Sequence, residues 1–141
     1  MARTYAQFAA VLFVVVGVAG LFTGDAGHVS NGQAGGNFDG ASLHLTYGRD
    51  VIDLALAAVF AYAGFLAKEE DAWIPVLSAG GFLLLLAVIG FIDGDDASGT
   101  RSVATLHFPL AINIFDLITG VVSILCGLGS IDEEPQPARS T

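Results

Sequence analysis

The sequence predicts an all-α protein, a four-helix transmembrane bundle built from two tandem helical hairpins. Three observations lead to this prediction. Of the 141 residues, 54% are hydrophobic and 13% are charged, whereas an ordinary soluble domain has about 25% charged residues. Four apolar runs are each long enough to cross a bilayer, whose hydrocarbon core takes about 20 helical residues. The second half of the chain also repeats features of the first.

The predicted spans follow one another with short polar connections. Pro75 and Pro109 each lie near the first turn of a predicted helix, where proline is tolerated because that N–H has no helical partner. The polar residues 68–71 form a tight link, so the second and third spans are antiparallel neighbours. Residues 131–141 are acidic and interrupted by proline, which predicts a disordered tail. The expected spans are residues 5–22, 43–67, 73–92 and 109–129, with hairpins at 1–67 and 68–130.

An internal repeat relates the two hairpins. At an offset of 63 residues, Asp53 corresponds to Asp116 and His44 to His107; at an offset of 70, Gly20 corresponds to Gly90. Because each unit crosses the membrane twice, both copies have the same orientation and form a parallel repeat about an axis along the membrane normal. The alternative is chance similarity between apolar helices, although paired His and Asp at one offset favour duplication.

An even number of spans places both termini on one side of the cell membrane. Three of the five cations lie on that side (Arg3, Lys68 and Arg139), and two lie on the other (Arg49 and Arg101). The positive-inside rule therefore predicts cytoplasmic termini. A cleaved signal peptide is the competing interpretation of the first span.

Two carboxylates in the predicted spans require an explanation. Inserting a carboxylate into the hydrocarbon region costs about 2.5–3.5 kcal/mol, so such a group normally faces the bundle interior with a partner. Asp53 and Asp116 are expected to meet near the repeat axis, with Asp50 and Asn113 nearby, and to share a proton or be neutralised by Arg49. This pattern suits either polar contacts that hold helices together or a proton or cation site.

Small residues on the same faces predict close helix packing, since helices in lipid associate through close backbone contact. Helical spacing places Asp116, Gly120, Ser123 and Gly127 on one stripe, and Asp53, Ala57, Phe60 and Gly64 on its counterpart. The predicted packing glycines are Gly20, Gly24, Gly64, Gly90, Gly94, Gly120 and Gly127.

All three histidines, His28, His44 and His107, lie on the side opposite the termini. Their spacing matches no strict metal-binding pattern, so we expect interfacial hydrogen bonds, with metal or haem ligation by His44 and His107 as the alternative. No cofactor is therefore predicted. The formal net charge of -9 argues against nucleic acid, and the single cysteine excludes a disulfide framework.

The layout resembles a family of uncharacterised prokaryotic four-helix integral membrane proteins of about 140 residues. In that family, the second and fourth spans carry an Asn-x-x-His-Leu pattern followed by glycine. Here Asn113 and Gly120 match this pattern, whereas Asp53 and Asp116 stand at the histidine positions. The resemblance implies the fold, and the family has no assigned activity.

These features predict a non-catalytic protein, because no nucleophile, triad or phosphate-loop motif is present. We expect a small structural or accessory subunit in the lipid bilayer that self-associates or packs against a larger membrane complex. The alternatives are a proton- or ion-conducting protein that uses the paired carboxylates, and a metal or haem binder. The acidic loops and single lysine suggest a source that lives in high salt.

Overall fold

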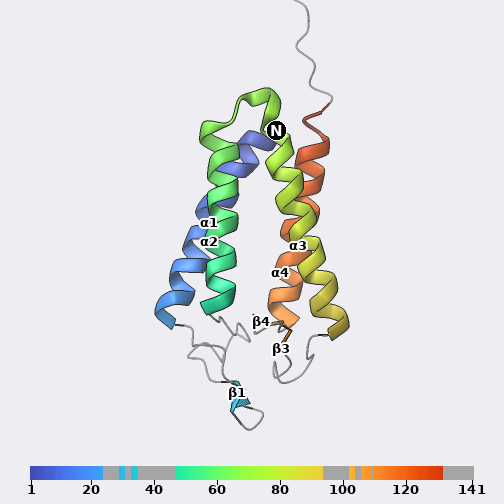
Figure 1. Ribbon diagram of the computed structural model, residues 1–141. Helices are drawn as coiled ribbons and strands as arrows, with labels where there is room; N and C mark the ends of the chain where they lie inside the picture. Colours follow the sequence, from blue (N-terminus) through green and yellow to red (C-terminus); the bar gives the residue numbers. More distant parts are fainter. Residues whose placement is uncertain are drawn as a thin grey trace, which may run out of the picture.

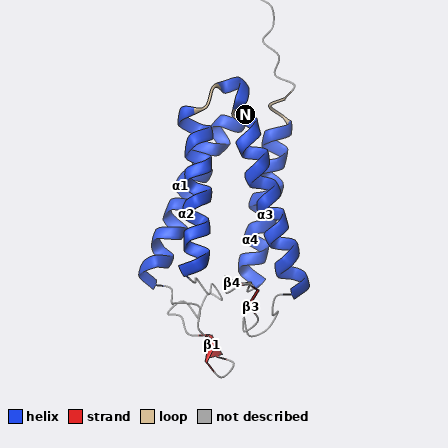
Figure 2. Cartoon of the chain, viewed as in Figure 1, coloured by secondary structure: helices blue, strands red, loops and turns tan. Residues whose placement is uncertain are grey.

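The computed structural model describes residues 1–23, 29–30, 33–34, 47–93, 102–103, 106–108 and 110–131. Four α-helices pack as a bundle: α1 (Ala2–Thr23), α2 (Tyr47–Ala61), α3 (Trp73–Asp93) and α4 (Leu110–Leu128). Two short antiparallel pairs, β1 (Val29–Ser30) with β2 (Gln33–Ala34) and β3 (Ser102–Val103) with β4 (Leu106–His107), lie at one end of it. The all-α prediction is confirmed, as Figure 2 shows.

The helices form two neighbouring pairs, in which α1 packs mainly on α2 and α3 on α4 (Figure 1). A π-helical turn, η2 (Tyr62–Leu66), extends α2 within the predicted second span. A 3₁₀ turn, η3 (Glu69–Asp71), lies in the predicted polar link at residues 68–71 and leads into α3. The backbone N–H of Ala2 donates to the hydroxyl of Ser130 at 2.7 Å. The start of α1 and the end of α4 therefore lie at the same end of the bundle.

Three helical segments within the described residues are long and apolar enough to cross a membrane: Ala2–Phe22, Glu69–Ile92 and Leu110–Leu128. Most of their exposed side chains are apolar, among them Phe8 and Phe22, which are 74% and 85% exposed. This is the pattern of an integral membrane protein. The fourth helix, α2, is 15 residues long and carries Arg49, Asp50 and Asp53, so it falls outside this group.

Glycines bring the helices of each pair into backbone contact. Gly20, Gly64, Gly90, Gly120 and Gly127 are all buried, as expected for packing positions. A Cβ atom at Gly64 would lie 2.9 Å from the backbone nitrogen of Gln7 on α1, so η2 and α1 touch through their main chains. The two remaining predicted packing positions, Gly24 and Gly94, lie outside the described residues.

Near the C-terminal end of the second helix, the carbonyl of Gly64 finds its hydrogen-bond donors on α1. The last carbonyls of a helix lack intrahelical partners. The carbonyl oxygen of Gly64 accepts hydrogen bonds from Nε of Arg3 at 3.1 Å and from Nε2 of Gln7 at 2.9 Å. Gln7 is the one strongly polar residue of the first predicted span, and this contact gives it a structural partner.

The core between the two pairs combines alanines with a few large rings. The ring of Phe13 on α1 stacks on Phe60 of α2, with centroids 5.5 Å apart, and meets Phe115 of α4 edge-on at the same distance. Such aromatic pairs contribute about 0.5–1.5 kcal/mol beyond their buried area. They form the apolar centre of the contact between the first helix pair and α4.

We predict that Gly64→Ala destabilises the protein by about 1–3 kcal/mol, the usual cost of overpacking, because the added methyl group meets the backbone of α1. The matched control is Gly81→Ala in α3, where a Cβ atom has no neighbour within 4 Å. Thermal unfolding in detergent should show a lower midpoint for the first variant and no loss for the second. Equal midpoints would contradict the close contact between η2 and α1.

Candidate polar site between the two helix pairs

Five polar residues predicted to lie in the membrane are buried at the β-strand end of the bundle. Arg49, Asp50 and Asp53 occupy the first two turns of α2, and Asn113 and Asp116 occupy the first two turns of α4. None of the five is more than 3% exposed. Because residues four apart share a helix face, Arg49 and Asp53 point in the same direction from α2.

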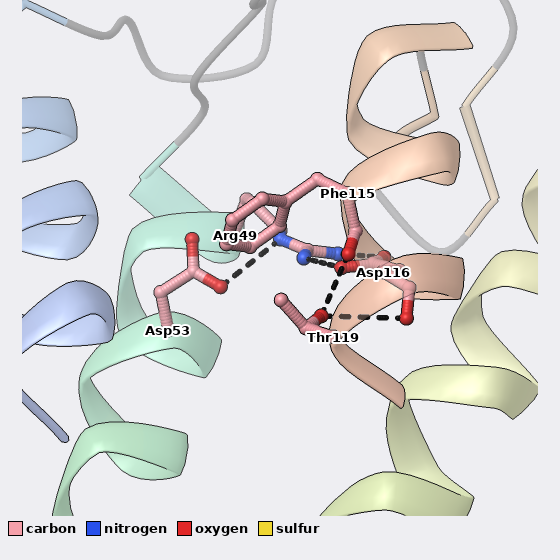
Figure 3. A network of polar contacts seen from close by, with 5 residues as sticks. All are labelled: Arg49, Asp53, Phe115, Asp116 and Thr119. Carbon is pink, nitrogen blue, oxygen red and sulfur yellow. Dashed lines mark hydrogen bonds and ion pairs between the residues drawn. The ribbon is translucent and has the colours of Figure 1, made fainter. Parts of the chain in front are cut away.

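Arg49 connects the two helix pairs. Its Nη1 donates to Oδ2 of Asp116 at 2.8 Å, and its Nη2 donates to Oδ1 of the same carboxylate. Its Nε lies 3.3 Å from Oδ1 of Asp53, one turn along α2. Figure 3 shows the guanidinium lying between the two carboxylates. A two-pronged arginine–carboxylate contact fixes orientation as well as distance, so the ion pair sets how α2 meets α4.

The sequence leaves open whether Asp53 and Asp116 share a proton or are neutralised by Arg49, and the structure distinguishes between the two. Asp53 and Asp116 both point toward the bundle interior, as expected from their helical spacing. They are bridged by Arg49 and do not contact each other through a shared proton. The other members of the predicted stripes are buried as well: Ala57, Phe60, Gly64, Gly120, Ser123 and Gly127.

Asp50 and Asn113 point away from this centre, each toward the other helix of its own pair. A Cβ atom at Gly20 of α1 would overlap the carboxylate of Asp50, and one at Gly90 of α3 would overlap the amide of Asn113. Asn113 donates from Nδ2 to the carbonyl of Phe108 at 3.1 Å. No hydrogen bond reaches either carboxylate oxygen of Asp50.

The charges of this site do not balance. Within the described residues, the site contains three buried carboxylates, those of Asp50, Asp53 and Asp116, and one buried guanidinium, that of Arg49. A buried charge without a partner is strongly disfavoured. The site can therefore hold the helix pairs together through Arg49, and its carboxylates outnumber the cations among the described residues.

A second polar contact joins the two helix pairs and is not predicted from the sequence. The Tyr5 hydroxyl donates to the carbonyl of Thr119 at 3.1 Å and lies 2.8 Å from the Ser123 hydroxyl. The side chain of Thr119 in turn donates to the carbonyl of Phe115 at 2.7 Å (Figure 3). The sequence feature that could have indicated this contact is Ser123, the only hydroxyl residue on the stripe of Asp116, Gly120, Ser123 and Gly127.

The histidines contribute no described site. His28 and His44 lie outside the described residues, and His107 is described through its backbone, which pairs with Ser102 in the β3–β4 ladder. Among the residues that the structure describes, no three His, Cys, Asp or Glu side chains are arranged to hold a metal ion. Cys126 is a partly buried free thiol.

Comparisons of this chain with protein-family models, with curated proteins and with solved structures find no match.

We predict that Arg49→Met lowers the free energy of unfolding by about 3–5 kcal/mol, because removing one partner leaves buried charges uncompensated. Adding Asp116→Asn should recover part of this loss, with a coupling free energy of about 0.5–3 kcal/mol. Unfolding in mixed detergent measures both.

The control for this cycle is Lys68→Met, since the Lys68–Glu70 pair is exposed and its atoms are 3.9 Å apart. Exposed pairs contribute little to stability, so this variant should unfold like the parent protein. An Arg49→Met protein of parental stability would show that the ion pair does not hold the bundle together.

Proposed function

We propose that this chain is a four-span integral membrane protein, made of two copies of one helical hairpin, that acts as a small non-catalytic subunit. The duplication is supported by burial that recurs at the two offsets seen in the sequence. Seven buried positions of residues 1–22 recur 70 residues later: 2, 6, 9, 10, 13, 17 and 20 correspond to 72, 76, 79, 80, 83, 87 and 90. Six of α2–η2 recur 63 residues later: 49, 50, 53, 57, 60 and 64 correspond to 112, 113, 116, 120, 123 and 127.

Contacts within the pairs support the same duplication. Gly20 faces Asp50 as Gly90 faces Asn113, and Gly64 faces Gln7 as Gly127 faces Leu77. In each contact, one residue has its counterpart 70 residues further along the chain, and the other has its counterpart 63 residues further along. Membership in the four-helix family that the sequence resembles is part of this proposal.

The proposal includes α2 with η2 as the fourth span. Together they cover residues 47–66 without a break, about 30 Å at 1.5 Å per residue. Their charged side chains are buried, and the outward ones are apolar, among them Val51 and Phe65. Both termini then lie on the cytoplasmic side, as the positive-inside rule favours.

The observation that carries the subunit role is a pair of apolar grooves at equivalent positions on the outer surface. One, of about 300 Å³, lies between α2 and α3; the other, of about 350 Å³, lies between α1 and α4. Residues 55, 56, 59, 78, 79 and 82 line the first, and their repeat counterparts 118, 119, 122, 8, 9 and 12 line the second. Grooves with small residues admit a neighbouring helix closely, from a second copy or from a larger complex.

Native mass spectrometry of the protein, extracted gently from its own membrane, tests this role. We expect an assembly of identical chains or a larger complex that contains this one. Ala55→Trp, which fills the groove between α2 and α3, should dissociate it. Val15→Phe, on an exposed position outside both grooves, should not. A bare monomer from the parent protein would refute the subunit role.

Proton or ion conduction through the paired carboxylates is the second candidate, favoured by the excess of buried carboxylates over Arg49. Under this alternative, vesicles containing the protein conduct protons, and Asp53→Asn combined with Asp116→Asn abolishes the flux while the assembly stays intact. A pH-sensitive dye inside the vesicles measures this. Flux no greater than in empty vesicles, or flux that survives the double substitution, would exclude this candidate.

A further inference from the structure

Among the described carboxylates of the buried site, Asp50 has neither a hydrogen bond nor an ion pair, whereas Asp53 and Asp116 both pair with Arg49. Its side chain is fully buried in the first turn of α2, and neither oxygen has a hydrogen bond. The carboxylate lies against Gly20 of α1, so closely that no Cβ atom would fit at that position. The carboxylate of Asp50 is therefore packed between α2 and α1.

The described charged groups around Asp50 do not neutralise it. On its own helix these are Arg49 and Asp53, and on α4 there is Asp116; the described side of α1 that packs here presents Gly17 and Gly20. Both Nη atoms of Arg49 bind Asp116, and its Nε approaches Asp53. With all four groups ionised, one positive charge would face three negative ones.

Asn113 shows what kind of group this position accepts. It is the counterpart of Asp50 at offset 63 and packs on Gly90 as Asp50 packs on Gly20. Its amide is neutral, with a donor nitrogen bound to the Phe108 carbonyl and an acceptor oxygen that has no partner. A protonated aspartic acid has nearly the same shape and the same combination of one donor end and one acceptor end.

We propose that Asp50 is a proton-binding site, in which the folded bundle holds this side chain as a neutral carboxylic acid at neutral pH. A proton from water binds one carboxylate oxygen, and no other reactant takes part. Neutralisation removes the large cost of burying an unpaired ion. It also leaves Asp53 and Asp116 as the two carboxylates that pair with the guanidinium of Arg49.

The packing favours a proton over a metal ion as the neutralising charge. Hard cations require six or more oxygen ligands, whereas the carboxylate of Asp50 lies so close to Gly20 that a Cβ atom there would overlap it. A proton needs no additional space. The inference is independent of the proposed subunit role, because it depends on burial and charge alone.

Infrared spectroscopy of the purified full-length protein at neutral pH tests the proposal, since the carbonyl stretch of a protonated carboxyl group is separate from the carboxylate bands. We expect this band in the parent protein, its loss in Asp50→Asn and its retention in Asp53→Asn. The reciprocal variant, Asn113→Asp, should gain a second such band. Asp50→Asn should unfold at the parental temperature or above it, which verifies that the loss is not due to misfolding.

Three results would overturn the proposal. The first is a parent spectrum without a protonated-carboxyl band at neutral pH. The second is a band that persists in Asp50→Asn. The third is a band that disappears in Asp53→Asn, which would assign the proton to Asp53 or to a pair of carboxylates.

Discussion

The guanidinium of Arg49 determines how the two halves of this bundle meet. Helices in lipid gain no hydrophobic energy by approaching one another, so contacts between them depend on close packing and polar bonds. Within each helix pair, glycines supply the close packing. Between the pairs, Arg49 binds Asp116 at one end, Tyr5 binds Thr119 nearer the other, and three phenylalanine rings fill the interval. The ion pair is the charged member of this set and the most directional.

A buried ion pair is a weak source of net stability, because the desolvation of both ions offsets their attraction. Its value here lies in orientation. A guanidinium that reaches one carboxylate with two nitrogens and a second with its third allows few relative positions of α2 and α4. The apolar rings tolerate sliding far better than the ion pair does. The polar contacts therefore account for register, and the glycines, alanines and rings supply the close packing.

Helix positions and buried faces could be predicted from the sequence because both follow from patterns along the chain. The third and fourth helices end within one residue of the predicted bounds, since apolar runs stop where polar residues begin. The inward direction of Asp53 and Asp116 follows from spacings of three and four. The bridge through Arg49 and the inward hydrogen bond of Tyr5 depend on distances between separate helices. The π-helical turn at Tyr62–Leu66 contains Gly64, whose close approach to α1 is also a tertiary contact.

The proposed duplication makes Asp53 and Asp116 equivalent to each other, and the guanidinium of Arg49 lies between them. Arg49 corresponds at offset 63 to Ile112, so only one copy supplies a cation to the pair. A symmetric dimer of identical hairpins must place the same residue on both sides of its axis. Joining two hairpins in one chain removes that restriction and lets a single arginine lie between twin aspartates. Under the proposed duplication, covalent linkage thereby permits an asymmetric electrostatic centre between two similar hairpins.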